Sequence, residues 1–182
     1  MYTNLEIEFK SGLTKDEYKA LLKKYALEDK IVVQTNYYFD NYNCDLIKNH
    51  IILRIREKDY NIKLTSKTKA ENGSLEKHII LEDNKALEMI KNGFNASIID
   101  LDYDVKMVAS LKTERVKMNY KTGVIFLDKN TYYDTVDYEV EFEAKNRLDG
   151  AIDFSNFLDE NNLKQVTLES KSKRAYKKAS LI

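Results

Sequence analysis

The chain has 182 residues, of which thirty are basic and thirty acidic, so its formal net charge at pH 7 is zero. This balance argues against a general binder of nucleic acids or of membrane surfaces. The single cysteine excludes an internal disulfide, and no apolar run approaches the roughly 18 residues of a membrane span. The N-terminus also lacks a signal-peptide pattern. We therefore expect one cytoplasmic domain over residues 1–182, with no membrane partner.

An alternating strand opens the chain. Over residues 3–10 the apolar side chains occupy one face, and the other face carries Glu6, Glu8 and Lys10. A helix is predicted to follow from Thr14, because Glu17 three residues later completes a capping-box spacing.

Further extended segments follow this helix. Strands are predicted over residues 31–40, 50–57, 61–65 and 75–82, separated by short turns. Arg54 and Arg56 share one face of the second of these strands, and Lys63 alternates with apolar residues on the third.

The alternating pattern is lost over residues 83–110, where two helical pieces are predicted, the second of them around 101–108. A meander of three antiparallel strands is then predicted, and its strands cover residues 111–120, 124–133 and 136–144. A helix over 149–161 and an extended segment over 165–176 complete the chain. The fold class is therefore α+β and mainly antiparallel β, and closure into an eight-stranded β-barrel with flanking helices would leave no exposed sheet edge.

Charged residues repeat on single faces of several strands. Glu139 and Glu141 repeat the Glu-x-Glu spacing of the first strand, so two facing pairs would bring four carboxylates together. At about 6 Å and an effective dielectric near 20, two such charges repel by roughly 3 kcal/mol. A divalent cation such as Mg²⁺ or Mn²⁺ would relieve this repulsion. The basic side chains would suit a polyanion with several phosphates.

A simpler interpretation is available for each motif alone. A Glu-x-Glu-x-Lys strand is typical of a sheet face in water, and the same holds for each of the other charged strands. The ordered set of charged strands, all with apolar opposite faces, favours inward-pointing charges instead.

Over nearly the whole chain, the sequence resembles the CYTH family, also called triphosphate tunnel metalloenzymes. The resemblance rests on an ordered series of residues: Glu6, Glu8, Lys10, Arg54, Arg56, Lys63, Glu76, Arg115, Asp128, Glu139, Glu141 and Lys171. It implies an eight-stranded tunnel that binds a triphosphate through basic residues and a metal through glutamates. Family members include several kinds of triphosphatase and a class of adenylate cyclases, so the fold does not define the substrate.

The resemblance also implies a role for each of these residues. Metal ligands would be Glu6, Glu8, Glu139 and Glu141. Glu76 would help to place a metal or the attacking water, and Lys171, Arg54 and Arg56 would act with it in catalysis. Substrate contacts would come from Lys10, Arg54, Arg56, Lys63, Arg115, Asp128, Lys171 and Lys173. Lys171 and Lys173 share a face of the predicted extended segment, so an alignment shift of two residues would exchange them, and we favour Lys171.

The leading hypothesis is hydrolysis of inorganic tripolyphosphate, with nucleoside or thiamine triphosphate as related substrates. Adenylate cyclase activity and a non-catalytic triphosphate-binding module remain as alternatives. Several residues are interpreted without a role in chemistry. Solvated charges are expected at Lys67, Lys69, Lys177 and Lys178, a rim or solvent position at Glu143, and ordinary strand positions at His50 and His78.

Overall fold

The computed structural model describes residues 1–179. Its strands are β1 (Tyr2–Leu13), β2 (Val32–Asp40), β3 (Ile52–Lys58), β4 (Asn61–Ala70), β5 (Gly73–Leu81), β6 (Phe94–Asn95), β7 (Asp104–Tyr120), β8 (Gly123–Tyr132) and β9 (Thr135–Ala144). Its α-helices are α1 (Lys15–Lys24), α2 (Asp45–Lys48), α3 (Asp83–Asn92), α4 (Arg147–Glu160) and α5 (Lys171–Lys178). None of the helices among these residues has the length and apolarity needed to cross a membrane.

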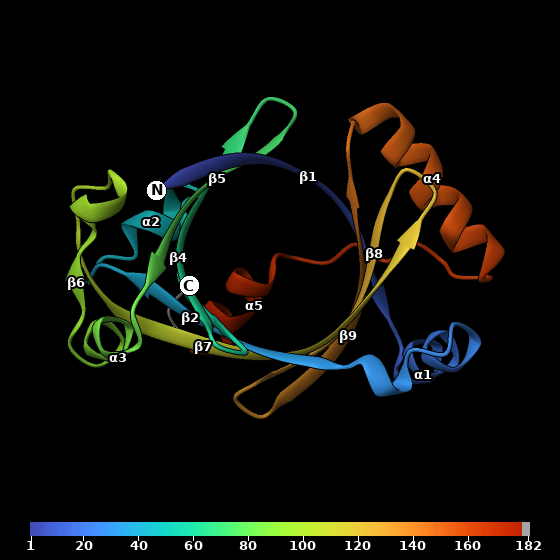
Figure 1. Ribbon diagram of the computed structural model, residues 1–182, viewed down its shortest axis with the longest axis horizontal. Coiled ribbons are helices and arrows are strands. Elements are labelled where there is room, and N and C mark those ends of the chain that lie inside the picture. Colours follow the sequence, from blue (N-terminus) through green and yellow to red (C-terminus); the bar gives the residue numbers. More distant parts are fainter. Residues whose placement is uncertain (180–182) are drawn as a thin grey trace.

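Eight strands form a closed antiparallel barrel. They run in the order β2-β3-β4-β5-β1-β9-β8-β7, and pairing of β2 with β7 closes the ring. Figure 1 looks into this ring, with helices on two opposite sides of the wall and α5 within its outline. The short strand β6 pairs with β7 as an addition to the barrel. The predicted eight-stranded barrel with flanking helices is confirmed.

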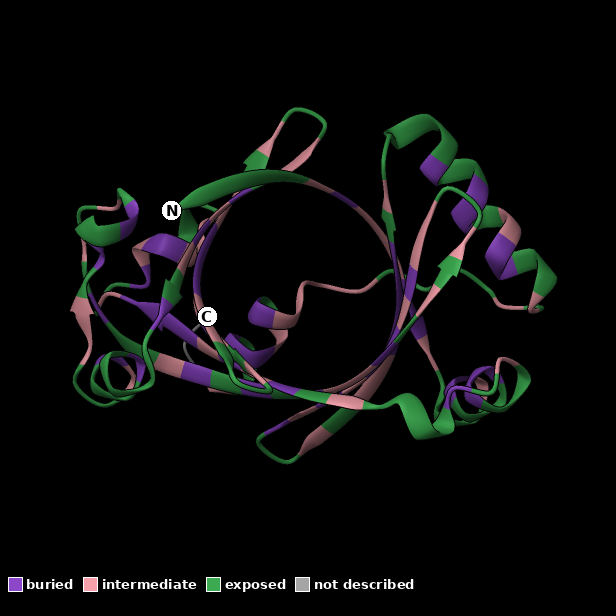
Figure 2. Ribbon diagram, viewed as in Figure 1, coloured by how far each residue is buried: buried purple, intermediate pink, exposed green. Residues whose placement is uncertain are grey.

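The apolar core lies outside the barrel wall. On one side α1 and α4 pack against the outer faces of β7, β8 and β9, where Phe142 and Phe157 are fully buried. On the other side α2 and α3 cover the outer faces of β2 to β5. In Figure 2 the buried parts of α4 lie on its side toward the wall. Because strand side chains alternate, this arrangement turns the charged face of each strand toward the interior.

The start of α1 forms as predicted. The Thr14 hydroxyl accepts a hydrogen bond from the Glu17 backbone N–H at 3.2 Å, and the Glu17 carboxylate accepts one from the Thr14 N–H at 2.7 Å. This capping box satisfies two amide groups that have no partner inside the helix. It also marks where the chain leaves the barrel after β1.

The helix predicted around residues 101–108 is wrong, because β7 already begins at Asp104. The long strand pairs with β2, for example Lys106 with Asp40 and Met107 with Phe39, while Val105 is buried in the second core. Backbone pairing on a neighbouring strand thus overrides the weak local pattern.

The extended segment predicted over 165–176 is wrong in its second half, where α5 begins at Lys171. Ser170 caps this helix by accepting a hydrogen bond from the Lys173 N–H at 3.3 Å. Ala175 and Tyr176 are buried against β2, β7 and β8, and the Tyr176 hydroxyl donates to the Phe39 carbonyl at 3.2 Å. Burial of these apolar residues against the strands stabilises the helix, which therefore packs across one part of the tunnel.

Candidate active site

Charged side chains from the strands and α5 surround a cavity of about 270 Å³ inside the barrel. Many of the residues named from the sequence line this cavity, and its charged and histidine side chains are Glu6, Glu8, Arg54, Arg56, Lys63, Lys67, Glu76, His78, Arg115, Glu141, Glu143 and Lys171. Lys10 lines an adjoining cavity together with Glu8 and Lys171, and its ammonium lies 3.7 Å from the Glu8 carboxylate. Acidic and basic residues therefore converge as expected, but the four carboxylates do not form one group: Glu139 and Glu141 lie with Asp128, whereas Glu6 and Glu8 lie around Lys67.

Three buried carboxylates lie together where α5 meets the wall, and we call Asp128, Glu139 and Glu141 the carboxylate pocket. One oxygen of each lies within 4.8 Å of the others. The Lys171 ammonium contacts all three and lies 2.8 Å from Asp128 and 2.5 Å from Glu141. Arg115 binds both oxygens of Asp128, at 2.7 and 2.5 Å, and also contacts Glu141.

The pKa values of Glu141 and Asp128 shift in opposite directions within this pocket. Burial, together with the neighbouring charges of Glu8 and Asp128, raises the pKa of Glu141 to about 8. Although burial alone would raise the pKa of Asp128, Lys171 and Arg115 hold it well below its ordinary value. The pocket supplies hard oxygen donors, which suit a divalent cation of the magnesium type. The chain's own cations contact the same oxygens, so a metal would have to share or displace them.

A second acidic group lies along β1 and β5. The Lys67 ammonium contacts Glu6 and lies 3.8 Å from Glu8 and 3.7 Å from Glu76. Despite burial, Lys67 lowers the pKa of Glu6 to about 2. Lys67 is therefore an interior residue, and its interpretation as a solvated charge is wrong. The strand was predicted to end at Thr65, but β4 continues to Ala70 and keeps Lys67 on the inner face.

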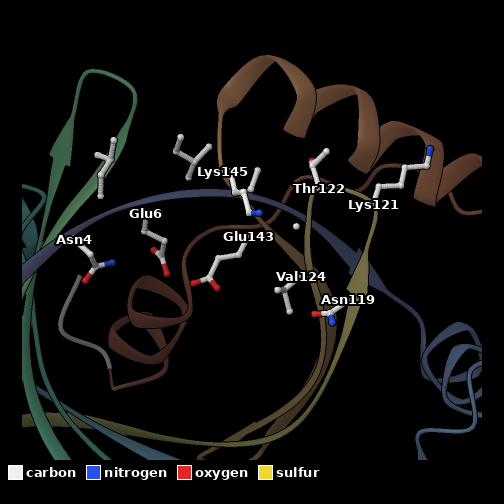
Figure 3. A pocket seen from close by; sticks show the side chains of 12 residues that line it. Asn4, Glu6, Asn119, Lys121, Thr122, Val124, Glu143 and Lys145 are labelled. Carbon is white, nitrogen blue, oxygen red and sulfur yellow. The ribbon is translucent and has the colours of Figure 1, made fainter.

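Glu143 lies at a mouth of the tunnel, next to Glu6. Figure 3 shows the two carboxylates turned toward each other below β1, with Asn4 beside them. Partial desolvation at this exposed position and the nearby Glu6 charge raise the pKa of Glu143 to about 7. The rim position expected for Glu143 agrees with this placement.

Two inner cations have no acidic partner. Among residues 1–179, no carboxylate oxygen lies within 4.0 Å of a nitrogen of Arg56 or of Lys63, and we call these two residues the unpaired cations. They face each other across β3 and β4. Arg56 donates to the Asn36 side-chain oxygen at 2.8 Å, and burial, Arg54 and Arg115 lower its pKa to about 9.

The unpaired cations also line a wider cavity of about 890 Å³ at this mouth. Apolar residues of β5, β7 and β8 contribute to its wall, namely Ile80, Met118, Val124 and Phe126. The Arg115 guanidinium lies 4.4 Å from the centre of the Phe126 ring. The mouth thus combines positive charge with an apolar, partly aromatic surface.

The C-terminal residues separate in space. Lys171 points into the carboxylate pocket, whereas Lys173 is exposed and lies 3.4 Å from Glu169. Residues two apart lie on different faces of a helix, so the argument that they share a face fails. Arg174, which the sequence interpretation missed, lies 2.6 Å from Glu139 and 3.0 Å from Asp137. Its spacing of three from Lys171 would have indicated a shared face if a helix had been predicted.

The other residues interpreted without a role in chemistry are mostly at the surface. Lys69, Lys177 and Lys178 are exposed, as expected. His50 lies in the turn before β3, with φ of 59°, and so is not a strand residue. His78 is in β5 and is buried at the cavity wall.

A closed antiparallel barrel with an inward-facing set of acidic and basic side chains defines a tunnel protein with a charged interior. The family model described as CYTH domain matches residues 4–176, and the chain belongs to this family. A Bacillus subtilis (strain 168) protein named "Putative triphosphatase YjbK" is 33% identical over 97% of this chain and 96% of its own length.

Solved structures show the same fold. A protein from Bacillus halodurans, described as a "putative adenylate cyclase", superposes with a TM-score of 0.89 at 27% identity and covers 96% of this chain and 98% of its own. The "putative adenylyl cyclase HpAC1" from Hippeastrum, described with a dominant triphosphatase activity, gives a TM-score of 0.78 at 20% identity, with 96% of each chain covered.

Proposed function

We propose that this protein is a metal-dependent triphosphatase that hydrolyses inorganic tripolyphosphate in its tunnel. The observation that supports this most directly is the position of Arg56 and Lys63, which face a cavity without an acidic partner among the described residues. Partly buried charges are stabilised by a counter-ion, and several cations around one cavity suit a ligand with several phosphates. The Bacillus subtilis relative, which bears the name of a triphosphatase, supports the same class of reaction.

In this proposal Lys10, Arg54, Arg56, Lys63, Arg115 and Lys171 contact phosphate oxygens, and Asp128 holds Arg115 and Lys171 in place. Glu76, which lies between Arg54, Lys67 and His78, helps to orient the attacking water. No protein nucleophile is required, because positioning and charge stabilisation account for most of the catalysis of phosphoryl transfer.

The proposed metal ligands are Glu6, Glu8, Glu139 and Glu141, and Mg²⁺ or Mn²⁺ is the proposed ion. All four are oxygen donors on the inner faces of β1 and β9. Burial and the nearby charges of Glu8 and Asp128 raise the pKa of Glu141, and a bound cation would favour its ionised form. When bound, a divalent cation supplies charge neutralisation on the phosphate oxygens.

A substrate panel tests the proposal. Purified protein is incubated with tripolyphosphate, pyrophosphate, ATP or thiamine triphosphate, each with Mg²⁺ or Mn²⁺, and phosphate release is measured. We expect the highest kcat/KM with tripolyphosphate and no activity in excess EDTA. Glu141→Gln should require a much higher metal concentration, whereas Glu143→Gln should behave like the wild type. Undiminished hydrolysis in EDTA would exclude the metal mechanism.

One observation favours a second candidate, the turnover of nucleoside triphosphates. The 890 Å³ mouth places Phe126 and Met118 beside the cationic residues, which provides a surface for an organic group attached to the triphosphate. The Bacillus halodurans structure bears the name of an adenylate cyclase. Measuring cyclic AMP alongside phosphate in the ATP reactions separates the possibilities. Cyclic AMP without phosphate would favour a cyclase, and tight binding without either product would favour a binding module.

A further inference from the structure

Gln34 carries a buried amide on the inner face of β2, at the wide mouth of the tunnel. The residue is only 3% exposed, and its Nε2 has no hydrogen-bond partner among residues 1–179. Asn36, two residues further along the same face, accepts a hydrogen bond from Arg56 Nε at 2.8 Å, which confirms that this face points into the tunnel. A buried N–H without an acceptor costs free energy, so nearly all such groups in proteins have a partner. The amide of Gln34 therefore indicates a place for a hydrogen-bond acceptor.

Two overlapping cavities define the position of Gln34 along the tunnel. The wide mouth of about 890 Å³ and the inner cavity of about 270 Å³ share Arg56, Lys63 and Arg115 in their walls. Gln34 lines the mouth and not the inner cavity, whereas Lys171 lines the inner cavity and not the mouth. The shared cations therefore lie between Lys171 and Gln34. A chain of phosphates that extends from Lys171 past these cations reaches Gln34 last.

The surroundings of Gln34 favour an anionic acceptor. Of the charged side chains that line the mouth, six are basic and only Glu143 is acidic. The terminal torsion of a glutamine has a broad energy profile, so the amide can turn its N–H toward the cavity that the residue lines. A phosphate oxygen held by the neighbouring cations can then accept a charge-assisted hydrogen bond from this uncharged donor.

We propose that Gln34 is a specificity-determining residue, whose amide N–H donates to the phosphate group nearest the mouth. This proposal rests on the proposed triphosphatase function. A pyrophosphate bound by Lys171 and the shared cations lacks the third phosphate and does not make this contact, so Gln34 favours a triphosphate over a diphosphate. Because the donor is uncharged, it adds affinity for the third phosphate without adding to the repulsion among the cations.

Calorimetry in EDTA, where no hydrolysis is expected, tests the contact by measuring the binding of tripolyphosphate and of pyrophosphate. Gln34→Met removes the amide but keeps an unbranched side chain of similar length. It should weaken tripolyphosphate binding about tenfold, as expected for losing one hydrogen bond to a charged acceptor, and leave pyrophosphate binding unchanged. Gln34→Glu should weaken tripolyphosphate binding further, because a carboxylate repels the phosphates. Gln165→Met is the matched control, since Gln165 is the other glutamine of the chain and is exposed.

Two further measurements separate a ligand contact from a structural role. The melting temperature of ligand-free Gln34→Met should equal or exceed that of the wild type, because the substitution removes a buried donor that has no partner. With nitrogen-15 labelling of glutamine, Gln165→Met leaves Gln34 as the single glutamine side-chain amide. We expect its NMR signals to shift more on adding tripolyphosphate than on adding pyrophosphate.

The outcomes distinguish this proposal from the proposed function. Equal weakening for both ligands, wild-type affinity in Gln34→Met or Gln34→Glu, or an amide signal that does not respond to tripolyphosphate would each overturn the role of Gln34. A lower melting temperature with unchanged affinity would show a structural role instead, which also refutes the proposal. A wild type that binds tripolyphosphate through Gln34 but does not hydrolyse it refutes the function and leaves the contact standing.

Discussion

The carboxylate pocket and the unpaired cations face one cavity but balance their charges differently. In the pocket, each acidic side chain contacts at least one of Arg115, Lys171 and Arg174. Across the cavity, Arg56 and Lys63 have no carboxylate within ion-pair distance among residues 1–179. Buried carboxylates that the chain itself neutralises cost folding little net free energy, whereas cations left without a partner reduce stability until an anion binds. The difference indicates that Arg56 and Lys63 are compensated by a ligand alone, whereas Arg115 and Lys171 both neutralise the pocket and face the cavity.

Substituting one arginine from each region should separate these two effects most strongly. Arg56→Ala should reduce turnover about 10- to 150-fold, as expected for losing charge-assisted contacts of about 1.5 to 3 kcal/mol. Its melting temperature should stay close to that of the wild type, because removing an unpaired buried charge offsets the lost hydrogen bond to Asn36. Kinetics and thermal unfolding without substrate measure the two quantities.

Arg115→Ala should lose activity to a similar degree and also unfold at a lower temperature. Asp128 and Glu141 would lose a cation that contacts both, and breaking a buried pair costs about 3 to 5 kcal/mol. For a chain of this size, 1 kcal/mol corresponds to about 2 to 4 °C. A larger drop in melting temperature for Arg56→Ala than for Arg115→Ala would contradict the comparison.

Lys171→Met should have the next largest effect, about tenfold or more on turnover. The substitution keeps most of the side-chain volume but removes the ammonium from among Asp128, Glu139 and Glu141. The carboxylates then repel one another, so the melting temperature should fall without metal and rise more on adding Mg²⁺ than it does for the wild type. Lys173→Met is the matched control, and equal effects at both positions would show that the α5 face is assigned wrongly.

The sequence was sufficient to predict the barrel because alternation of charged and apolar residues is a local signal that repeats in nearly every strand. Arg54, Arg56, Glu139 and Glu141 were assigned to inner faces on this basis. Side chains were assigned to the wrong face where the alternation was interrupted, or where the segment is a helix and not a strand. Lys67 was interpreted as a surface charge because its strand was predicted to end at Thr65, five residues too early. Lys67 lies four residues after Lys63, so both side chains are on the same face of β4.

The C-terminal part of the site could not be predicted in the same way. The segment from Lys171 to Lys178 has mainly polar residues, and its helix depends on burying Ala175 and Tyr176 against distant strands. Without the helix, neither the separation of Lys171 from Lys173 nor the inward position of Arg174 could be inferred. The early start of β7 has the same cause, since pairing with β2 is a long-range contact.

The smallest predicted effect concerns the Glu6–Glu143 pair at the tunnel mouth, where like charges meet without full compensation. The pKa of Glu143 is raised to about 7, so its neutral form is favoured in the folded protein. The raised pKa of Glu143 increases the free energy of unfolding at low pH. This stabilisation is complete below the ordinary glutamate pKa of about 4.5 and is lost as the pH rises through 7.

Without metal, the melting temperature of the wild type should therefore fall between pH 5 and pH 8 more steeply than that of Glu143→Gln. Glutamine stays neutral and can still donate to Glu6, so the two proteins should agree at pH 5 and differ by a few degrees at pH 8. Glu71→Gln, in the exposed turn before β5, controls for the loss of one surface charge. If the melting temperature of Glu143→Gln follows the wild-type curve at every pH, Glu6 and Glu143 do not share a proton. The negative charges at the mouth would then be neutralised by nearby cations, as they are in the carboxylate pocket.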